Sequence, residues 1–337
     1  MRNNRKMMAV ILVLTMVLSL AACGSKSNQS DGASQANKYA NWPAETVTLV
    51  APVKAGGNVD SYARIDAEYF EKATGKSMVV ENLNTGGGIL GYETVKNAKA
   101  DGYTLLIYNG SLYTTYYTGL WEFAPLDVFV PIVTTNDKGG SAIVCRADAP
   151  YNNLKELCEA AKAAPNTILF GINSASAAEF IAAEIELDGD CKFKKVDAGE
   201  AAERLTQILG GILDVGTMSI SQASQYEEAG QVKILATTDT TQSQYVKATP
   251  ACEQGFPHCV YDSQTIIYGP KDMDPELVER INEIFQGIVK DATAVEKSNA
   301  GSAPLNVMNV KDSQAEAQAQ NDSMKAAADM LGYEYKK

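Results

Sequence analysis

Residues 49–64, LVAPVKAGGNVDSYAR, have the composition of a site that binds an anion. The apolar, partly β-branched run 47–50 predicts a buried strand, and Pro52 ends it because proline has no N–H for the ladder. Gly56 and Gly57 allow a tight turn, and residue types that favour a helix start follow. A helix N-terminus after such a turn offers N–H groups and a partial positive charge to an anion. The same residues also fit a strand-to-helix turn without a ligand.

Two further turns of small and polar residues follow predicted strands. Residues 109–111 (NGS) follow the strand 103–108, and residues 173–176 (NSAS) follow the strand 168–171 and precede a helix. In an open α/β sheet, ligand-binding loops lie at the carboxyl ends of the strands. The two turns are therefore candidates for facing loops across a cleft between two domains.

Strands and helices alternate along the chain, which predicts an α/β fold. The 337 residues are enough for two domains, and the net charge of −12 argues against a nucleic-acid partner held by a basic surface. The expected strands, besides the one before Pro52, are 77–80, 103–108, 142–145, 168–171, 214–218, 232–237 and 263–268. The expected helices include 154–163, 275–290 and 313–330.

The first residues have the pattern of an export signal. Three cations within residues 2–6 precede the apolar stretch 7–20, which is short for a membrane span, and small residues then precede Cys23. This order resembles a bacterial lipobox, so residues 1–23 are expected to be a lipoprotein signal with Cys23 lipidated. An ordinary secretory signal that contains a cysteine is the alternative. Residues 24–40 are mostly small and polar, as in a flexible tether.

Cysteine usage does not indicate a metal site. The five remaining cysteines contain no C-x-x-C pair, so a zinc ribbon is not expected. Cys252 and Cys259 are close enough in sequence to bridge a local loop, and they fit equally well as small buried residues. The five are Cys145, Cys158, Cys191, Cys252 and Cys259.

The sequence also argues against an enzyme. His258 is the only histidine, and no G-x-S-x-G elbow is present for a serine hydrolase. The glycines at 86, 88 and 91 match the dinucleotide spacing, but a polar loop precedes them and no acidic residue follows at the required distance. We therefore expect no catalytic residues, cofactor or metal.

Taken in order, four blocks of residues resemble the substrate-binding proteins of tripartite tricarboxylate transporters, which include the Bordetella uptake proteins. The blocks span nearly all of the chain after the signal, and the second is the most specific. They are Leu49–Arg64 with the glycine turn; Val79–Asn82, Gly86–Gly88, Gly91 and Asp101–Leu105; Leu209–Gly211 with Ser219; and Gly255–Pro257 with Tyr268–Pro270.

This resemblance implies a type II periplasmic-binding-protein fold with two hinge crossings, near 132–141 and 263–267. Domain 1 would combine 41–137 with 266–337, and domain 2 would be 138–265. The function implied is capture of a small di- or tricarboxylate by hinge closure, and its delivery to an integral membrane permease by a monomeric, lipid-anchored extracytoplasmic protein. A sensor that docks on a signalling receptor uses the same closure and is the alternative; an extracytoplasmic hydrolase ranks below both.

The family's binding roles transfer only to positions where the motifs match. Residues 55–58 of the glycine turn should offer N–H groups to one carboxylate, and the loops 109–111 and 173–176 should meet the ligand. Ser219 lies at the expected strand end. The chain departs from its relatives at Gln264, where they often have an aromatic residue, and at Asp197, which suits either an ammonium contact or a helix cap. The candidate ligand-binding residues are Ala55, Gly56, Gly57, Asn58, Asn109, Gly110, Ser111, Asn173, Ser174, Ala175, Ser176, Asp197, Ser219 and Gln264.

Overall fold

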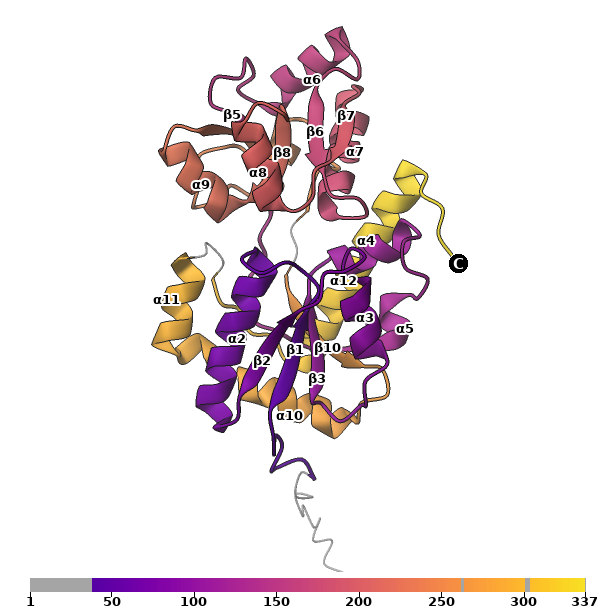
Figure 1. Ribbon diagram of the computed structural model, residues 1–337, viewed down its shortest axis with the longest axis vertical. Helices are drawn as coiled ribbons and strands as arrows, with labels where there is room; N and C mark the ends of the chain where they lie inside the picture. The colour runs from indigo at the N-terminus through magenta and orange to yellow at the C-terminus, as the bar shows by residue number, and fades with distance from the viewer. Residues whose placement is uncertain (1–37, 262–263, 301–303, 337) are drawn as a thin grey trace, which may run out of the picture. The chain divides into compact units, whose positions relative to one another are not determined.

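A computed structural model describes residues 38–261, 264–300 and 304–336, so the predicted signal segment, Cys23 and most of the predicted tether lie outside the described residues. The strands form two five-stranded mixed sheets (Figure 1). In order across the first sheet the strands are β2 (Met78–Asn82), β1 (Val47–Ala51), β3 (Thr104–Tyr108), β10 (Ile266–Pro270) and β4 (Phe129–Thr134). In the second they are β7 (Lys194–Asp197), β6 (Leu169–Ile172), β8 (Val215–Ser219), β5 (Ser141–Arg146) and β9 (Val232–Thr237).

The chain passes between the two sheets twice. It completes four strands of the first sheet, builds all of the second, and returns in β10, which runs antiparallel to both β3 and β4. In the second sheet β5 is the strand antiparallel to its neighbours β8 and β9. The predicted α/β architecture with two crossings is confirmed, whereas the domain boundaries inferred from the sequence remain a prediction.

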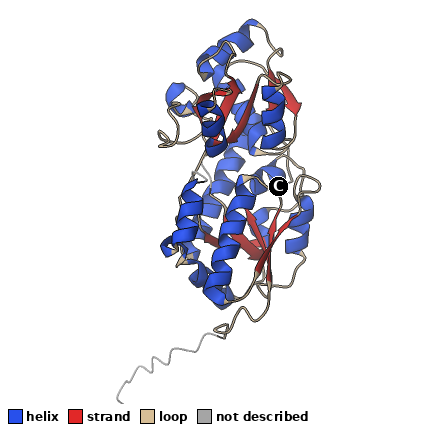
Figure 2. Ribbon diagram, turned by 60° about the vertical axis from the view of Figure 1, so that its left-hand side comes forward, coloured by secondary structure: helices blue, strands red, loops and turns tan. Residues whose placement is uncertain are grey.

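Side chains alternate between the two faces of the first sheet, as the strand period of two requires. Leu49 and Ile107 pack on the face covered by α2 and α10, while Val50 and Leu106 pack on the other, against α3 and α4. Figure 2 shows helices on both sides of the strands. The helices of this part are α2 (Asn58–Thr74), α3 (Ile89–Lys96), α4 (Ser111–Tyr117), α5 (Pro125–Val128), α10 (Pro275–Phe285), η2 (Ile288–Lys290), α11 (Ala292–Ala300) and α12 (Val310–Leu331).

The second sheet has the same layered construction. Ile143 and Phe170 belong to the core shared with α6 and α7, whereas Ala142 and Met218 belong to the core shared with α8 and α9. The helices here are α6 (Leu154–Ala163), α7 (Ala177–Gly189), α8 (Ala201–Leu209), α9 (Ile220–Glu228) and η1 (Ala251–Gln254). No helix among the described residues is both long enough and apolar enough to cross a membrane.

The C-terminal helix α12 contacts both parts of the fold. It packs on β4 and α4 and also on α7, so Met324 and Ala328 share a core with Phe180. Beyond the helix, the ring of Tyr333 stacks on Phe180, and its hydroxyl donates to Glu179 Oε1 at 2.8 Å. The last residues of the chain therefore hold the first turn of α7.

Candidate functional site

One pocket is lined by residues from both sheets and from both crossings between them. The first sheet contributes the start of α2 and the loop after β3, and the second contributes the end of β8 and the start of α9. The lining residues are Asn58, Val59, Tyr62, Asn109, Asn136, Asp137, Gly139, Gly140, Ser141, Ser219, Ile220, Ser221, Tyr261 and Thr265. Asn58, Asn109 and Ser219 are thus the predicted site residues that line it.

Two helix N-termini meet at this pocket. Helix α2 begins after Gly57 without a side-chain cap, so its first N–H groups are not covered by the chain's own capping residue. Helix α9 begins after Ser219, whose hydroxyl accepts a hydrogen bond from Gln222 N at 3.1 Å. Each N-terminus carries a partial charge of about +0.5, and the one charged residue among those that line the pocket is Asp137. The pocket therefore suits an anion without using a lysine or arginine.

The glycine turn before α2 is fixed by a buried carboxylate. Asp60 is 3% exposed, and its Oδ2 accepts from Gly56 N at 2.9 Å and from Arg64 Nε at 3.0 Å. Asn82 Nδ2 donates to the other oxygen at 2.9 Å. Burial opposes the charge of Asp60, but the bonds from Arg64, Gly56 and Asn82 outweigh it and lower its pKa. The predicted N–H donor of Gly56 is therefore bonded within the protein, and the donors left for a ligand are those at the helix start.

The predicted loop after β3 lies beside the second crossing. Asn109 Oδ1 accepts from Ser111 N at 3.1 Å, and the Ser111 and Tyr261 hydroxyls are 3.4 Å apart. A Cβ on Gly110 would lie 3.0 Å from the Tyr261 hydroxyl, so glycine permits this close approach. Tyr261 thereby links the loop to the pocket wall.

The predicted loop 173–176 is held by its own polar contacts and is not part of the pocket lining. Ser176 caps α7, and the Ser174 hydroxyl donates to Asp197 Oδ2 at 2.6 Å. Ala175 has a φ of +58°, and its N–H donates to Glu179 Oε2 at 2.7 Å. Asp197 thus stabilises this loop, whereas the cap of the following helix is a capping box formed by Glu200 and Glu203. Ligand contacts by these loop residues stay a prediction.

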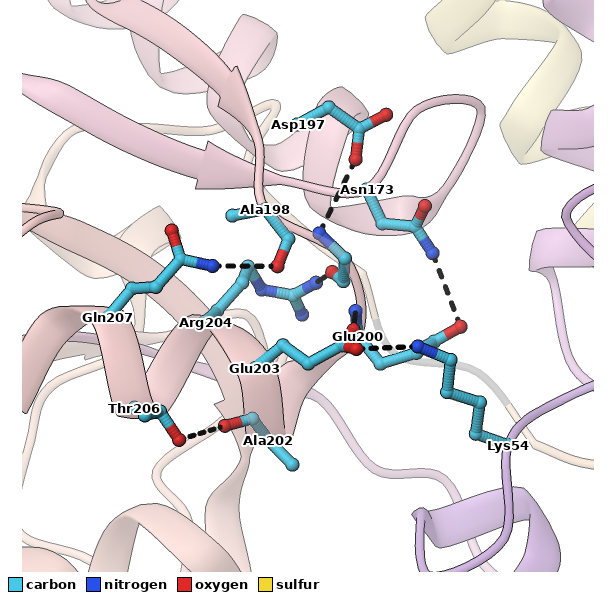
Figure 3. A network of polar contacts seen from close by, with 11 residues as sticks. Lys54, Asn173, Asp197, Ala198, Glu200, Ala202, Glu203, Arg204, Thr206 and Gln207 are labelled. Atoms are coloured by element: carbon cyan, nitrogen blue, oxygen red, sulfur yellow. Dashed lines mark hydrogen bonds and ion pairs between the residues drawn. The ribbon is translucent and has the colours of Figure 1, made fainter.

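A polar network joins the turn before α2 to α8 (Figure 3). Lys54 Nζ lies 2.6 Å from Glu203 Oε1, and both side chains are about half exposed. Asn173 Nδ2 donates to Glu200 Oε1 at 3.4 Å. The pair of Lys54 and Glu203 connects an element of the first sheet to an element of the second.

Arg204 holds the end of β8 from inside the protein. It is 6% exposed, and it donates to Thr217 O at 2.9 Å and to Gly199 O at 2.6 Å. Figure 3 shows its guanidinium beside the turn before α8. Burial lowers its pKa to about 10, so the guanidinium stays charged at neutral pH. These bonds fix the strand two residues before Ser219 and thereby the start of α9.

Gln264 lies behind the pocket. It is fully buried, and its Nε2 donates to Asn136 O at 2.6 Å, which joins the two crossings. Its neighbour Thr265 lines the pocket and donates its N–H to Asn136 Oδ1 at 3.1 Å. Sequence reasoning missed Asn136 and Tyr261, although the predicted crossing 132–141 contains the first of them.

The described residues contain no group of three or more side chains placed to hold a metal ion. His258 lies outside the pocket lining. Its backbone N–H donates to Asp188 Oδ2 at 2.9 Å, and its ring Nδ1 contacts Asp188 Oδ1.

Comparisons with known proteins agree with a solute-binding role. Residues 62–331 match the model of the tripartite tricarboxylate transporter family receptor. The chain is 23% identical to protein BugT of Bordetella pertussis over 269 residues, which cover 78% of this chain and 82% of BugT. The solved periplasmic binding protein BugD superposes with a TM-score of 0.77 at 23% identity, covering 88% of this chain and all of BugD. MatC of Rhodopseudomonas palustris, solved with bound malate, gives a TM-score of 0.76 at 18% identity, over 85% of this chain and all of MatC. The chain therefore belongs to the receptor family of the tripartite tricarboxylate transporters.

Proposed function

We propose that this receptor captures a small dicarboxylate in the pocket at the starts of α2 and α9. The proposal rests on one observation. The N-terminus of α2, which packs on the first sheet, and that of α9, which packs on the second, lie at the same pocket. Each can bind one carboxylate group through backbone N–H groups. MatC, which shares this fold, was solved with malate, a four-carbon dicarboxylate.

The number of helix N-termini at the pocket favours two carboxylates over three. Two N-termini supply a total of about one positive charge, and Asp137 contributes a negative charge to the pocket wall. A third ligand carboxylate would meet no further positive group among the residues that line the pocket. The hydroxyls of Ser219, Ser221 and Tyr62 are suited to bind oxygen atoms of a substituted acid.

Closure of the two parts around the ligand completes the binding step. A ligand that contacts both parts of the fold stabilises the closed form, because it binds that form more tightly than the open one. The receptor then delivers the solute to integral membrane permease subunits, from an extracytoplasmic position secured by a lipid on Cys23. Labelling cells with a radioactive fatty acid tests the anchor. The wild-type chain should incorporate the label, and Cys23→Ala should not.

Proline at the first position of α2 tests the N–H donors directly. Proline fits the first helical position, and the extended Gly57 (ψ 177°) is compatible with a following proline. Asn58→Pro removes one N–H, whereas the control Asn58→Ala removes only the side chain. A hydrogen bond to a charged group contributes about 1.5–3 kcal/mol, so Asn58→Pro should weaken dicarboxylate binding about 10- to 150-fold relative to Asn58→Ala. Calorimetry on both variants measures this ratio, and equal affinities would contradict the proposal.

A ligand panel tests the class of solute. Thermal melting of the full chain carrying Cys23→Ser should shift upward with malate, succinate, glutarate or adipate, since a ligand that binds only the folded state raises the melting temperature. Citrate should shift it less. A shift confined to amino acids would favour the ammonium contact and the sensor alternative, and a shift with neutral sugars alone would refute the anion site.

A further inference from the structure

Two buried cysteines lie in direct contact outside the site described above. Cys158 is on α6, and Cys191 follows the end of α7. Their sulfur atoms are 3.3 Å apart, closer than two carbon atoms in ordinary contact, and the residues are 3% and 4% exposed. No other atom therefore separates the two sulfurs.

The surrounding residues make room for this contact. A Cβ on Gly189, in the last turn of α7, would lie 2.5 Å from Cys158 Sγ, so only glycine leaves space for the thiol there. A disulfide has a sulfur separation of about 2.05 Å, so the two sulfurs need to approach by about 1.3 Å to form one.

The other three cysteines downstream of the signal have different surroundings. Cys252, for which the sequence left open both a bridge to Cys259 and a place as a small buried residue, contacts the carbonyl oxygens of Asp239 and Thr240 and is partly exposed. Burial raises the pKa of the Cys145 thiol to about 11 and also raises that of Cys259. These thiols are therefore poor nucleophiles.

We propose that Cys158 and Cys191 form a disulfide that ties α6 to the end of α7 once the exported chain meets a small disulfide oxidant. The proposal rests on the extracytoplasmic location given under the proposed function, because such compartments favour disulfides. The bond closes a loop that contains β6, the turn 173–176 and all of α7. It therefore stabilises the elements that present this predicted ligand loop.

The reaction is an ordinary thiol–disulfide exchange. The hydrogen bond between the two thiols raises the pKa of Cys158 and lowers that of Cys191, so Cys191 ionises first. Its thiolate attacks one sulfur of oxidised glutathione and releases one glutathione thiolate. The Cys158 thiolate then attacks the Cys191 sulfur of the mixed disulfide and releases the second. The two cysteines lose two protons and two electrons, and oxidised glutathione is reduced to two glutathione molecules.

Mass spectrometry tests the linkage. The full chain carrying Cys23→Ser is unfolded and refolded with oxidised glutathione, and the remaining thiols are then alkylated under denaturing conditions. We expect a digest peptide that joins Cys158 to Cys191 and three alkylated cysteines. Five alkylated cysteines, or a link between Cys252 and Cys259, would overturn the proposal.

The melting temperature tests the consequence for stability. The closed loop of about 34 residues should raise the melting temperature of the oxidised protein by about 4–8 °C over the protein treated with dithiothreitol. The control Cys252→Ala should keep this difference, and Cys158→Ala and Cys191→Ala should each abolish it. If the oxidised and reduced proteins differ in melting temperature by less than 1 °C, the disulfide does not stabilise the fold. This comparison keeps Cys158 and Cys191 in place, so it holds even if Cys158→Ala folds poorly.

Discussion

Replacing Asp66 by asparagine should change how the stability of the receptor depends on pH. Asp66 lies on α2, is 1% exposed, and accepts a hydrogen bond from Thr135 Oγ1 at 2.9 Å in the first crossing. Burial raises its pKa from 3.8 to about 7, an effect that the bond from Thr135 reduces but does not cancel. The side chain is therefore protonated in the folded protein under conditions where the unfolded chain has already lost the proton.

The sign and size of the effect follow from proton linkage. Between the unfolded and the folded pKa the folded state binds more protons, so the contribution of Asp66 to stability falls as pH rises. This contribution is complete below pH 3.8 and is lost as pH rises through about 7. Between pH 5 and pH 8 the loss is about 2–3 kcal/mol, from 1.36 kcal/mol per pH unit. Asparagine keeps the acceptor for Thr135 and does not titrate.

Urea unfolding at pH 5 and pH 8 measures this difference. Relative to the wild-type chain, Asp66→Asn should gain about 2–3 kcal/mol of unfolding free energy between the two pH values. Glu68→Gln is the matched control, because Glu68 is on the same helix and exposed, and its substitution should change the pH dependence by less than about 0.5 kcal/mol. If Asp66→Asn and the wild-type chain show the same pH dependence, the carboxyl is not protonated in the folded state and the reasoning fails.

Three further substitutions test an ion pair and two glycine turns. Lys54→Met removes the ion pair with Glu203; because both side chains are about half exposed, dicarboxylate affinity measured by calorimetry should fall less than fivefold, and 1 M salt should remove the difference. A larger loss that persists in salt would mean that Lys54 contacts the ligand. Gly88→Ala should destabilise the fold by about 2 kcal/mol or more in urea unfolding, because φ is +96° and the new Cβ would lie 2.9 Å from a backbone oxygen. Gly56→Ala, with a φ of +91° and nothing within 4 Å, should cost only about 1 kcal/mol, and equal costs would contradict the steric argument.

Strong local patterns in the sequence predicted several elements closely. The helix expected at 154–163 and the strand expected at 232–237 have those bounds in the structure, since their apolar periodicity is clear. The helix expected at 275–290 ends instead at Phe285, and a separate 3-10 turn follows after Gly287. The edge strand β7 was missed because its sequence, KKVD, is mostly polar and exposed.

The site was predicted only where one local segment forms it. The glycine turn and the helix after it were found. Gly57 is the N-cap of that helix, and Asp60 bonds back to Gly56 from the third helical position. Asn136 and Tyr261 lie 125 residues apart, and no sequence period connects them. Their proximity depends on how the two crossings pair, which is a tertiary property.

The bonds of the first crossing bear on the closure that we propose. On one side of the pocket Asn136 is bonded to Thr265, and on the other Gly140 N donates to Asp239 Oδ1 at 2.6 Å while Ser141 N donates to Thr238 Oγ1 at 2.8 Å. These bonds hold both ends of the first crossing, and the stretch 137–139 between them is also held, because Asp137 N donates to Pro304 O at 2.7 Å. Asp137 and Gly139, which line the pocket, belong to that stretch. Under the proposed closure, a ligand in the pocket contacts Asp137 and Gly139 of this crossing, so we expect its size to affect how far the two parts close.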